Sequence, residues 1–348
     1  MYRSSNIKGR EKMAPLQLAR LRKSKVLRDW VSQTNLSLKN IIAPYFVVSG
    51  KNIERPIKAM PGIFHLSVDR LLKELEEFKQ INAILLFSLP ESKNNTASQS
   101  YKKDGIIQKA IQAVKKNFPW MIVISDVCLC GYTLHGHCGI IENLKFKDKK
   151  VKSQFKIQNY KINEEKTREV LAKIALSHAE SGADLVAPSA MVDCQVKVIR
   201  QALDKRGFNH TGILAYSAKY ASNFYGPFRE ALNSAPVFDD RKTYQLDFRN
   251  SDEALREIEC DLTEGADIVM VKPALSYLDI IHQVKEKFKV PIAAYSVSGE
   301  YSMIKKFSQN PETEKKLALE ILTSIKRAGA DFIITYWAKE LKEWLKEV

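Results

Sequence analysis

Three of the five cysteines lie close together in the sequence and have the chemistry of a metal site. Cys128, Cys130 and Cys138 fall within eleven positions, with His135 and His137 between the last two. Thiolates are strong zinc ligands, and three protein ligands leave the fourth tetrahedral position for water or substrate. The spacing therefore favours a catalytic zinc site. Two alternatives are a structural site completed by one of the histidines, and a buried cluster without metal.

Two lysines stand at the ends of apolar runs, where a charged side chain is unusual. Lys219 follows Tyr216-Ser-Ala, and Lys272 lies between Met270-Val and Pro273. Burial beside a second ammonium lowers the pKa of an amine and leaves it free to attack a carbonyl. The pair therefore predicts Schiff-base chemistry on ketone substrates, whereas either lysine alone is as compatible with a structural salt bridge.

The segment between the two lysines is a long connection rich in aromatic residues, which is typical of a lid over an active site. It contains Arg229, Arg241 and Gln245. Guanidinium groups bind carboxylates through two parallel hydrogen bonds, and a glutamine amide adds another. We expect these three side chains to hold a substrate carboxylate, the alternative being that the arginines are ordinary surface residues.

Eight short apolar runs alternate with charged, helical segments and must position these groups. Near-continuous apolar strands indicate a parallel sheet buried on both faces, with helical crossovers between the strands. Eight βα units favour a TIM (β/α)8 barrel, an α/β fold, over a doubly wound open sheet. Helices are expected at 166–180, 252–264 and 312–328, and a Gly-Ala-Asp sequence precedes three of the strands. The predicted strands are 41–48, 83–89, 121–127, 185–188, 212–216, 267–271, 291–297 and 332–336.

In such a barrel the reactive groups lie at the carboxyl ends of the strands. The side chains found at these ends are Asp126, Lys219, Lys272, Ser298 and Tyr336, and the three cysteines follow Asp126 directly. All of them are polar or ionisable. The fold and the chemistry thus point to the same edge of the barrel.

The charge of the chain is uneven. It has 55 Lys and Arg against 40 Asp and Glu in 348 residues, a formal charge of +15. Most of the excess lies in two segments, 1–25 with eight basic residues and 145–161 with seven lysines, so the rest is nearly neutral. The first segment is predicted to be an extended arm and the second an exposed loop. A nucleic-acid partner is therefore not expected.

No apolar stretch is long enough to cross a bilayer, and the basic start of the chain lacks the apolar core of a secretory signal. Cysteines grouped as metal ligands indicate a reducing compartment. We expect no membrane partner and a cytoplasmic location, although a basic leader segment could also direct a protein to an organelle.

An ordered set of motifs resembles the porphobilinogen synthase (5-aminolevulinate dehydratase) family. The motifs are the cysteine segment 126–139, Ala187-Pro-Ser, Tyr216-Ser-Ala-Lys219, Phe224 to Arg229, Gly265 to Pro273, and Tyr295 to Glu300. The likeness runs from about residue 16 to the C-terminus. It implies a homo-octamer in which residues 1–35 form an arm for subunit contacts and residues 36–348 a catalytic TIM barrel.

The resemblance also implies the reaction, in which two molecules of 5-aminolevulinate condense to porphobilinogen with loss of two waters. It implies a Schiff base on Lys272 with the substrate that supplies the propionate side chain, and one on Lys219 with the second substrate. Zinc on the three cysteines is implied to bind the amine of that second substrate. Asp126 is implied to orient the site or move protons.

Further roles come from the same resemblance. One substrate carboxylate is assigned to Arg229, Arg241 and Gln245, and the other to Ser298 and Tyr336. Bacterial-type members have a glutamate matching Glu257 that helps bind an allosteric magnesium between subunits. Animal members have a cysteine where this chain has Thr243, so an additional zinc there is not expected.

Two other functions are compatible with parts of the sequence. A class I aldolase on a related barrel needs one Schiff-base lysine and no metal. A zinc-containing nucleic-acid-binding protein accounts for the positive charge, but the cysteine spacing matches no zinc-finger pattern.

Overall fold

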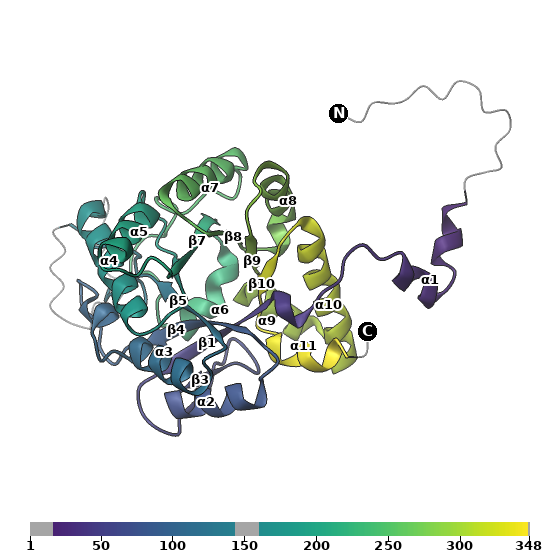
Figure 1. The fold of residues 1–348 in the computed structure, drawn as a ribbon, viewed down its shortest axis with the longest axis horizontal. Helices are drawn as coiled ribbons and strands as arrows, with labels where there is room; N and C mark the ends of the chain where they lie inside the picture. Colours follow the sequence, from purple (N-terminus) through teal and green to yellow (C-terminus); the bar gives the residue numbers. More distant parts are fainter. Residues whose placement is uncertain (1–16, 143–159, 347–348) are drawn as a thin grey trace. The chain divides into compact units, whose positions relative to one another are not determined.

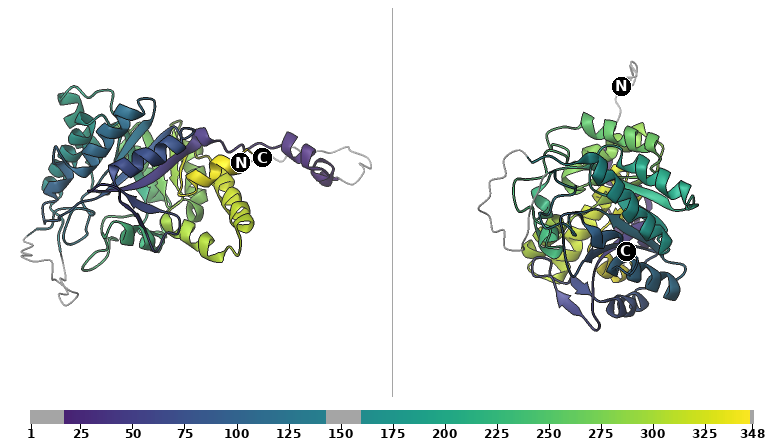
Figure 2. Two further views of the ribbon diagram at one scale, coloured as in Figure 1. Left: turned by 90° about the horizontal axis from the view of Figure 1, so that it is seen from below. Right: turned by 90° about the vertical axis from the view of Figure 1, so that its left-hand side faces the viewer.

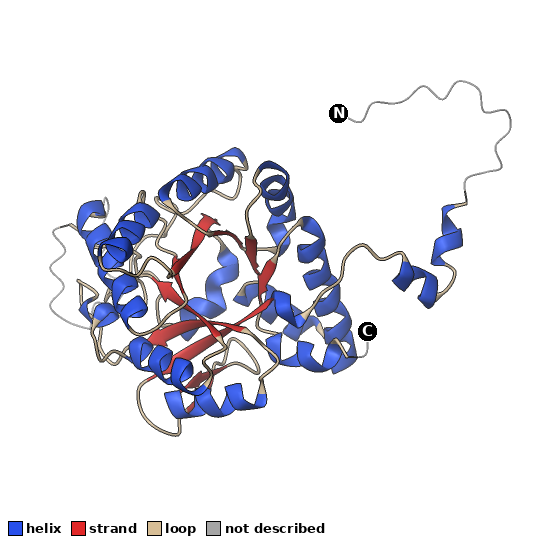
Figure 3. Ribbon diagram, in the orientation of Figure 1, coloured by secondary structure: helices blue, strands red, loops and turns tan. Residues whose placement is uncertain are grey.

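Eight parallel strands form a closed ring in which the last strand pairs with the first. The computed structural model describes residues 17–142 and 160–346. Ile41 pairs with Ile333 and closes the ring. Helices enclose the strands (Figures 1 and 3), so the predicted TIM barrel is confirmed and the open sheet is wrong. The barrel strands are β1 (Ile41–Val48), β4 (Ala83–Leu89), β5 (Ile122–Val127), β6 (Leu185–Pro188), β7 (Gly212–Lys219), β8 (Ile268–Lys272), β9 (Ile292–Tyr295) and β10 (Phe332–Ile334).

The helices between the strands follow the predicted segments closely. Asn163 caps the start of α4 by accepting the N–H of Lys166, and Asn310 caps α10 by accepting that of Thr313. The three helices expected from the sequence are confirmed to within two residues. The helices are α2 (Val68–Glu77), α3 (Ile106–Asn117), α4 (Glu164–Glu180), α5 (Gln195–Lys205), α6 (Gly226–Ala231), α7 (Asp252–Glu264), α8 (Leu278–Lys287), α9 (Ser298–Phe307), α10 (Pro311–Ala328) and α11 (Ala338–Trp344).

The Gly-Ala-Asp sequences form one repeated joint between a helix and the next strand. In each, the glycine has a positive φ that ends the helix, between 98° and 127°. The aspartate then accepts the backbone N–H of one of the first two residues of the neighbouring strand. Asp184 accepts that of Val123 at 2.8 Å, and Asp267 accepts that of Ile213 at 2.7 Å. The repeat therefore fixes how neighbouring strands start relative to one another.

A small hairpin beside β1 was not predicted. It consists of β2 (Glu54–Pro56) and β3 (Phe64–Leu66), which pair antiparallel, and β3 pairs in parallel with Phe46 and Val47 near the carboxyl end of β1 (Figure 2). Both strands have three residues, and β2 is fully exposed. Such short strands lack the run of apolar residues that identified the barrel strands.

The chain divides into two compact units, residues 1–35 and 36–348. In the first unit, a 3-10 helix (Leu18–Arg22) precedes α1 (Lys25–Trp30), and Ser24 caps α1. Neither helix has a buried residue, and Trp30 is 80% exposed. Every helix in the described part of the chain is too short or too polar to span a bilayer.

Candidate active site

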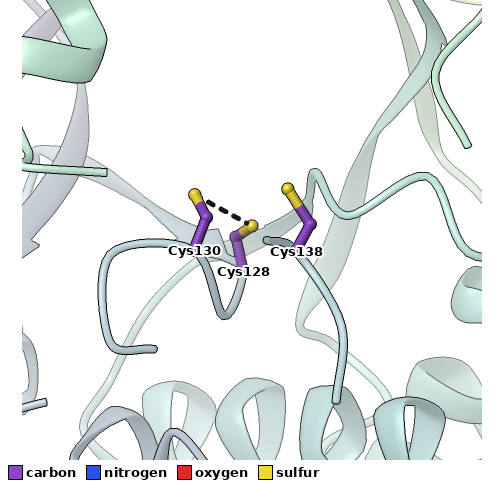
Figure 4. Close-up of side chains that lie close together, drawn as sticks. All are labelled: Cys128, Cys130 and Cys138. Carbon is purple, nitrogen blue, oxygen red and sulfur yellow. Dashed lines mark hydrogen bonds between the residues drawn. The ribbon is translucent and has the colours of Figure 1, made fainter. Parts of the chain in front are cut away.

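The three clustered cysteines converge in space at the end of β5. Their sulfur atoms lie within 4.8 Å of one another, and all three side chains are buried. Figure 4 shows Cys128 and Cys130 on one part of the loop, with their sulfurs joined by a 3.5 Å contact, and Cys138 facing them from another part. Within the described ranges, no other histidine, cysteine or carboxylate group of three converges this closely.

The surroundings favour the thiolate at Cys138, whereas hydrogen bonds with Cys130 and Cys138 and burial raise the pKa of Cys128 well above its usual value. Hydrogen bonds from Cys128 and Cys130 lower the pKa of Cys138 well below its usual value, and the charges of Arg241 and Lys219 act in the same direction. Soft, buried sulfur donors without a carboxylate among them are a set that suits zinc. The residues present therefore fit a zinc ion with three protein ligands.

The two histidines of the loop are not members of this sulfur cluster. His137 uses both ring nitrogens elsewhere, 3.0 Å from the Phe238 carbonyl oxygen and 3.2 Å from the Tyr244 hydroxyl. His135 accepts the backbone N–H of His137 on Nδ1, and its Nε2 is buried without a hydrogen-bond partner. The structural zinc site completed by a histidine is therefore not supported, and His137 instead fastens the loop to the segment containing Phe238.

That segment, residues 233–247, lies against the cysteine loop and is called the lid below. Arg241 donates to the carbonyl oxygens of Gly136 in the loop and of Ser234 in the lid, at 2.8 and 2.7 Å. Gly136 has φ +72°, and a Cβ there would lie 2.4 Å from the Ala235 carbonyl oxygen. Only glycine permits both the backbone conformation and this close approach.

The two predicted lysines lie side by side. Lys219 on β7 pairs in register with Lys272 on β8, and their side chains are 5% and 4% exposed. The Nζ of Lys219 donates to the backbone carbonyl of Ser189, directly after β6. The sequence placed both lysines at strand ends, and the register brings them together within the barrel.

Aromatic rings surround the amine of Lys272. The ring centroids of Tyr295, Phe228, Tyr216 and Tyr225 lie 4.2, 4.9, 5.0 and 5.1 Å from its Nζ. Burial and the charge of the neighbouring lysine lower the pKa of Lys272 well below its usual value. This environment favours the neutral amine, which is the nucleophilic form.

Asp126 lies at the end of β5, between the cysteines and the lysines. Burial and the nearby Cys130 raise its pKa to about 6, while Lys219 and a hydrogen bond with Ser189 oppose the rise. Its carboxyl group can therefore accept or release a proton near neutral pH.

The predicted carboxylate-binding residues hold unused hydrogen-bonding capacity. Arg241 and Gln245 are 4% and 3% exposed, and Arg229 is half-buried. The Nε atoms of both arginines and both amide atoms of Gln245 are buried without partners in the described structure. Such groups are rare in native proteins because each costs free energy, so a bound ligand is expected to satisfy them.

Ser298 and Tyr336 are buried, and each already has a polar partner. Ser298 is the first residue of α9; its hydroxyl accepts the N–H of Phe228 at 3.0 Å and lies 3.3 Å from the Phe224 carbonyl oxygen. The hydroxyl of Tyr336 lies 3.0 Å from that of Tyr295. Ser298 thus links α9 to α6 and to the residues just before it. Tyr336 contacts Tyr295, one of the four rings around Lys272.

Glu257 lies apart from this site, on α7. It lines a hollow of about 450 Å³ together with four other carboxylates: Glu164, Asp193, Asp247 and Glu253. Burial, Asp193 and Glu253 raise the pKa of Glu257. These carboxylates do not converge to metal-ligand distance among the described residues.

Three kinds of residue at the site were given no role from the sequence, although Ser189 and the four rings lie in the motifs quoted for the family resemblance. They are Ser189, which contacts both Asp126 and Lys219, the four rings around Lys272, and Tyr244, which contacts the cysteine loop. Ser189 follows β6, so the strand-end rule could have found it. Apart from the family motifs, the spacing of the rings and of Tyr244 does not distinguish them from core residues.

The comparisons with known proteins agree with this geometry. The family model named Delta-aminolevulinic acid dehydratase matches residues 16–344. Curated proteins of that name are 49% identical in Bacillus subtilis and 51% identical in Methanothermus sociabilis, covering 94% of this chain and 97% and 98% of theirs. A solved delta-aminolevulinic acid dehydratase (porphobilinogen synthase) from Toxoplasma gondii, in complex with porphobilinogen, superimposes with a TM-score of 0.88 at 42% identity, covering 96% of this chain and 93% of that one. The chain belongs to the delta-aminolevulinic acid dehydratase family of lyases.

Proposed function

We propose that this chain condenses two molecules of 5-aminolevulinate to porphobilinogen with loss of two waters, a step of heme and tetrapyrrole biosynthesis. The observation that carries the proposal is the in-register pair Lys219 and Lys272, both buried, beside the cluster of three cysteines. Family membership supports the same reaction. A class I aldolase needs neither the second lysine nor the cysteines.

Each lysine would form one imine. The neutral amine of Lys272 adds to the ketone carbon of one substrate and expels its oxygen as water, and Lys219 does the same with the second. Asp126 would accept and return protons between these centres, and its pKa of about 6 supports this role. Both waters have left once the imines have formed, so the lysines leave as free amines: the amine of one substrate replaces one lysine at its imine carbon, and the other lysine is eliminated when the new carbon–carbon bond becomes a ring double bond.

The carboxylate ends of the substrates would be held by separate groups. We assign one carboxylate to Arg229, Arg241 and Gln245, because the unpaired Nε atoms of the two arginines and the Nε2 of Gln245 can donate hydrogen bonds to its oxygens. We assign the other to Ser298 and Tyr336. For that role their hydroxyls must exchange their present partners for the ligand.

Zinc is the proposed metal, held by Cys128, Cys130 and Cys138. When bound there, zinc supplies a Lewis acid that holds the amine of the second substrate and stabilises developing negative charge. Magnesium is proposed at Glu257 as an activator, supported by the acidic hollow on α7. Both assignments can be tested by metal analysis of the purified protein.

We also propose a homo-octamer in the cytoplasm, with residues 1–35 as the arm for subunit contacts. The exposed Trp30 on a helix that buries none of its own residues supports a partner surface for the arm.

The deciding experiment is an assay of the metal-loaded protein with 5-aminolevulinate, in which Ehrlich's reagent detects the pyrrole. A chelator should abolish the pyrrole, and added zinc should restore it. Absence of any pyrrole from metal-replete, folded protein would overturn the proposed reaction.

A further inference from the structure

Strand β7 contains one residue more than its partner between two points of fixed register. Ala215 pairs with Val269 and Ala218 pairs with Val271, so three steps along β7 match two steps along β8. The pairing of β8 with β9 is continuous over the same stretch. The irregularity is therefore a β-bulge in β7, formed by the two residues between Ala215 and Ala218.

This bulge decides which way Lys219 points. Side chains three positions apart on a regular strand face opposite sides of the sheet. Tyr216 and Lys219 are three apart, yet both face the interior, where the Tyr216 ring centroid lies 5.4 Å from the Nζ of Lys219 and 5.0 Å from that of Lys272. Without the additional residue, either the tyrosine or the lysine would face the surrounding helices instead.

The additional residue, Ser217, faces outward and contacts α7, the helix that packs outside β7 (Figure 1). Its hydroxyl donates to the Ala215 carbonyl oxygen at 3.4 Å, and it also lies close enough to the Asp261 carboxyl to lower the pKa of that group. Ser217 and Asp261 are 1% and 7% exposed. A polar contact between strand and helix thus lies directly on the bulge.

Asp261 occupies an unfavourable position for a carboxylate. It lies in the last turn of α7, where the helix dipole disfavours negative charge, and burial raises its pKa to about 7. Glu264 and Glu257 raise the pKa further, and only the hydrogen bond from Ser217 lowers it. An apolar side chain at this buried position would stabilise the packing of α7 on β7 more than an aspartate does.

We propose that Asp261 is a positioning residue that holds the β7 bulge through Ser217 and thereby turns Lys219 into the barrel beside Lys272. The inference rests on the proposed two-lysine function. Asp261 touches neither lysine, and its effect on the reaction is transmitted through the backbone of β7.

The experiment tests whether one small molecule can reach the amines of Lys219 and Lys272 at the same time. The probe is a linear diketone with a carboxylate at each end, which loses one water to each lysine and forms two imines. Borohydride reduces both imines to stable amines, and mass spectrometry of the digested protein quantifies peptides cross-linked through Lys219 and Lys272. The monoketone 4-oxopentanoate, trapped in the same way, reports on each lysine separately, because the labelled Lys219 and Lys272 peptides differ in mass.

Asp261→Leu and Ser217→Ala should each lower the cross-linked fraction about tenfold, the effect of one lost buried hydrogen bond. The kcat for pyrrole formation should fall with it, while trapping of 4-oxopentanoate on Lys272 stays at the wild-type level. Asp261→Asn retains a hydrogen bond to Ser217 and should restore the cross-link. Ser217→Ala keeps the test decisive if the leucine variant does not fold.

Ser125→Ala is the matched control. Ser125 on β5 also makes a buried strand-to-helix hydrogen bond, 2.9 Å to the Nδ1 of His178, but β5 pairs without a register shift on either side. This variant should lose stability and keep the wild-type cross-link.

Two results would overturn the inference in different ways. A wild-type cross-link in folded Asp261→Leu and Ser217→Ala would refute the positioning role and leave the two-lysine function intact. No cross-link in the wild type would refute the two-lysine function, and the inference with it.

Discussion

At the scale of single residues, the site depends on amines and thiols removed from water. The amine of Lys272 is kept neutral by burial and by its lysine neighbour, within a ring of four aromatic side chains. Burying a lysine amine among aromatic rings costs folding free energy, which a residue with a purely structural role would not repay. The cost is explained if the neutral amine is the reacting group.

Lys272→Met should therefore lower the rate of pyrrole formation at least about a thousandfold, because the covalent step loses its nucleophile. The methionine replaces the buried aliphatic chain, so the melting temperature should not fall. Ehrlich's assay and calorimetry measure the two quantities. Pyrrole formation near the wild-type rate would remove Lys272 from the mechanism.

Cys138→Ala should abolish tight binding of one zinc ion per chain, since two thiolates cannot complete the proposed site. Cys194→Ala is the control, because Cys194 is an exposed free cysteine outside the cluster. Zinc bound after dialysis, measured by atomic emission, should fall to background only in the first variant. Equal zinc content in both would place the metal elsewhere.

Asp261 should make the protein less stable as the pH rises. Its folded pKa of about 7 lies above the ordinary 3.8, so protonation favours the folded state. The stabilisation is complete below about pH 4 and is lost as the pH rises through about 7, at about 1.4 kcal/mol per pH unit within that window. Asp261→Asn removes this contribution, and denaturant unfolding at several pH values measures it. The variant should gain stability relative to the wild type from pH 4 to 8; a constant difference would contradict the assignment.

At the scale of elements, the carboxyl ends of the strands are held by side chains from the surrounding helices. Glu300 on α9 accepts the backbone N–H groups of Ala274 and Leu275 after β8, at 3.1 and 2.9 Å, and that of Val297 after β9 at 3.0 Å. This one carboxylate ties the loop after Lys272 to the turn that precedes Ser298. The lid is tied to the cysteine loop in a comparable way, through Arg241 and His137.

Gly136→Ala tests the contact between lid and cysteine loop. The new Cβ would lie 2.4 Å from the Ala235 carbonyl oxygen, so the lid must move away and the KM for 5-aminolevulinate should rise about tenfold or more. Gly207→Ala is the control, because Gly207 also has a positive φ, +81°, but has no atom within 4 Å of the new Cβ. Both variants carry the same kind of backbone strain, so only the first should change KM. Equal effects would mean that strain, and not the contact, is responsible.

At the scale of the whole molecule, the barrel buries its own apolar strands, whereas the described part of the first unit does not bury its apolar side chains. Leu18, Val26 and Trp30 are 66%, 77% and 80% exposed. An exposed tryptophan on a short helix is the kind of side chain that contributes most to a protein–protein interface. This exposure agrees with the proposed role of residues 1–35 in assembly.

Trp30→Ser should weaken the assembly and shift the sedimentation profile toward smaller species at micromolar concentration, because a buried tryptophan contributes about 2 kcal/mol or more to an interface. Trp120→Ser is the control, since Trp120 is 52% exposed in the barrel unit. An unchanged profile for Trp30→Ser would exclude α1 from the subunit contact.

Most strands and helices of this protein, and its metal-ligand candidates, could be predicted from the sequence because they are marked by patterns of neighbouring residues. The apolar runs of β1 and β5 and the helix 252–264 identify themselves by composition and period, so the eight βα units follow from the sequence. The cysteine spacing identified the metal-ligand candidates for the same reason. The hairpin β2–β3 was missed because its strands are too short to have a period.

The tertiary structure decided what depends on register and on contacts between distant segments. The sequence placed Lys219 just after a strand ending at Tyr216, whereas the strand continues through a bulge that directs Lys219 inward. No local pattern indicates such a bulge, because it is stabilised across space by Asp261. Likewise, the engagement of His137 by the lid and the unpaired atoms of Gln245 appear only when the chain is folded. The sequence by itself determined which groups carry the chemistry, and the packing of helices on strands determined how these groups face one another.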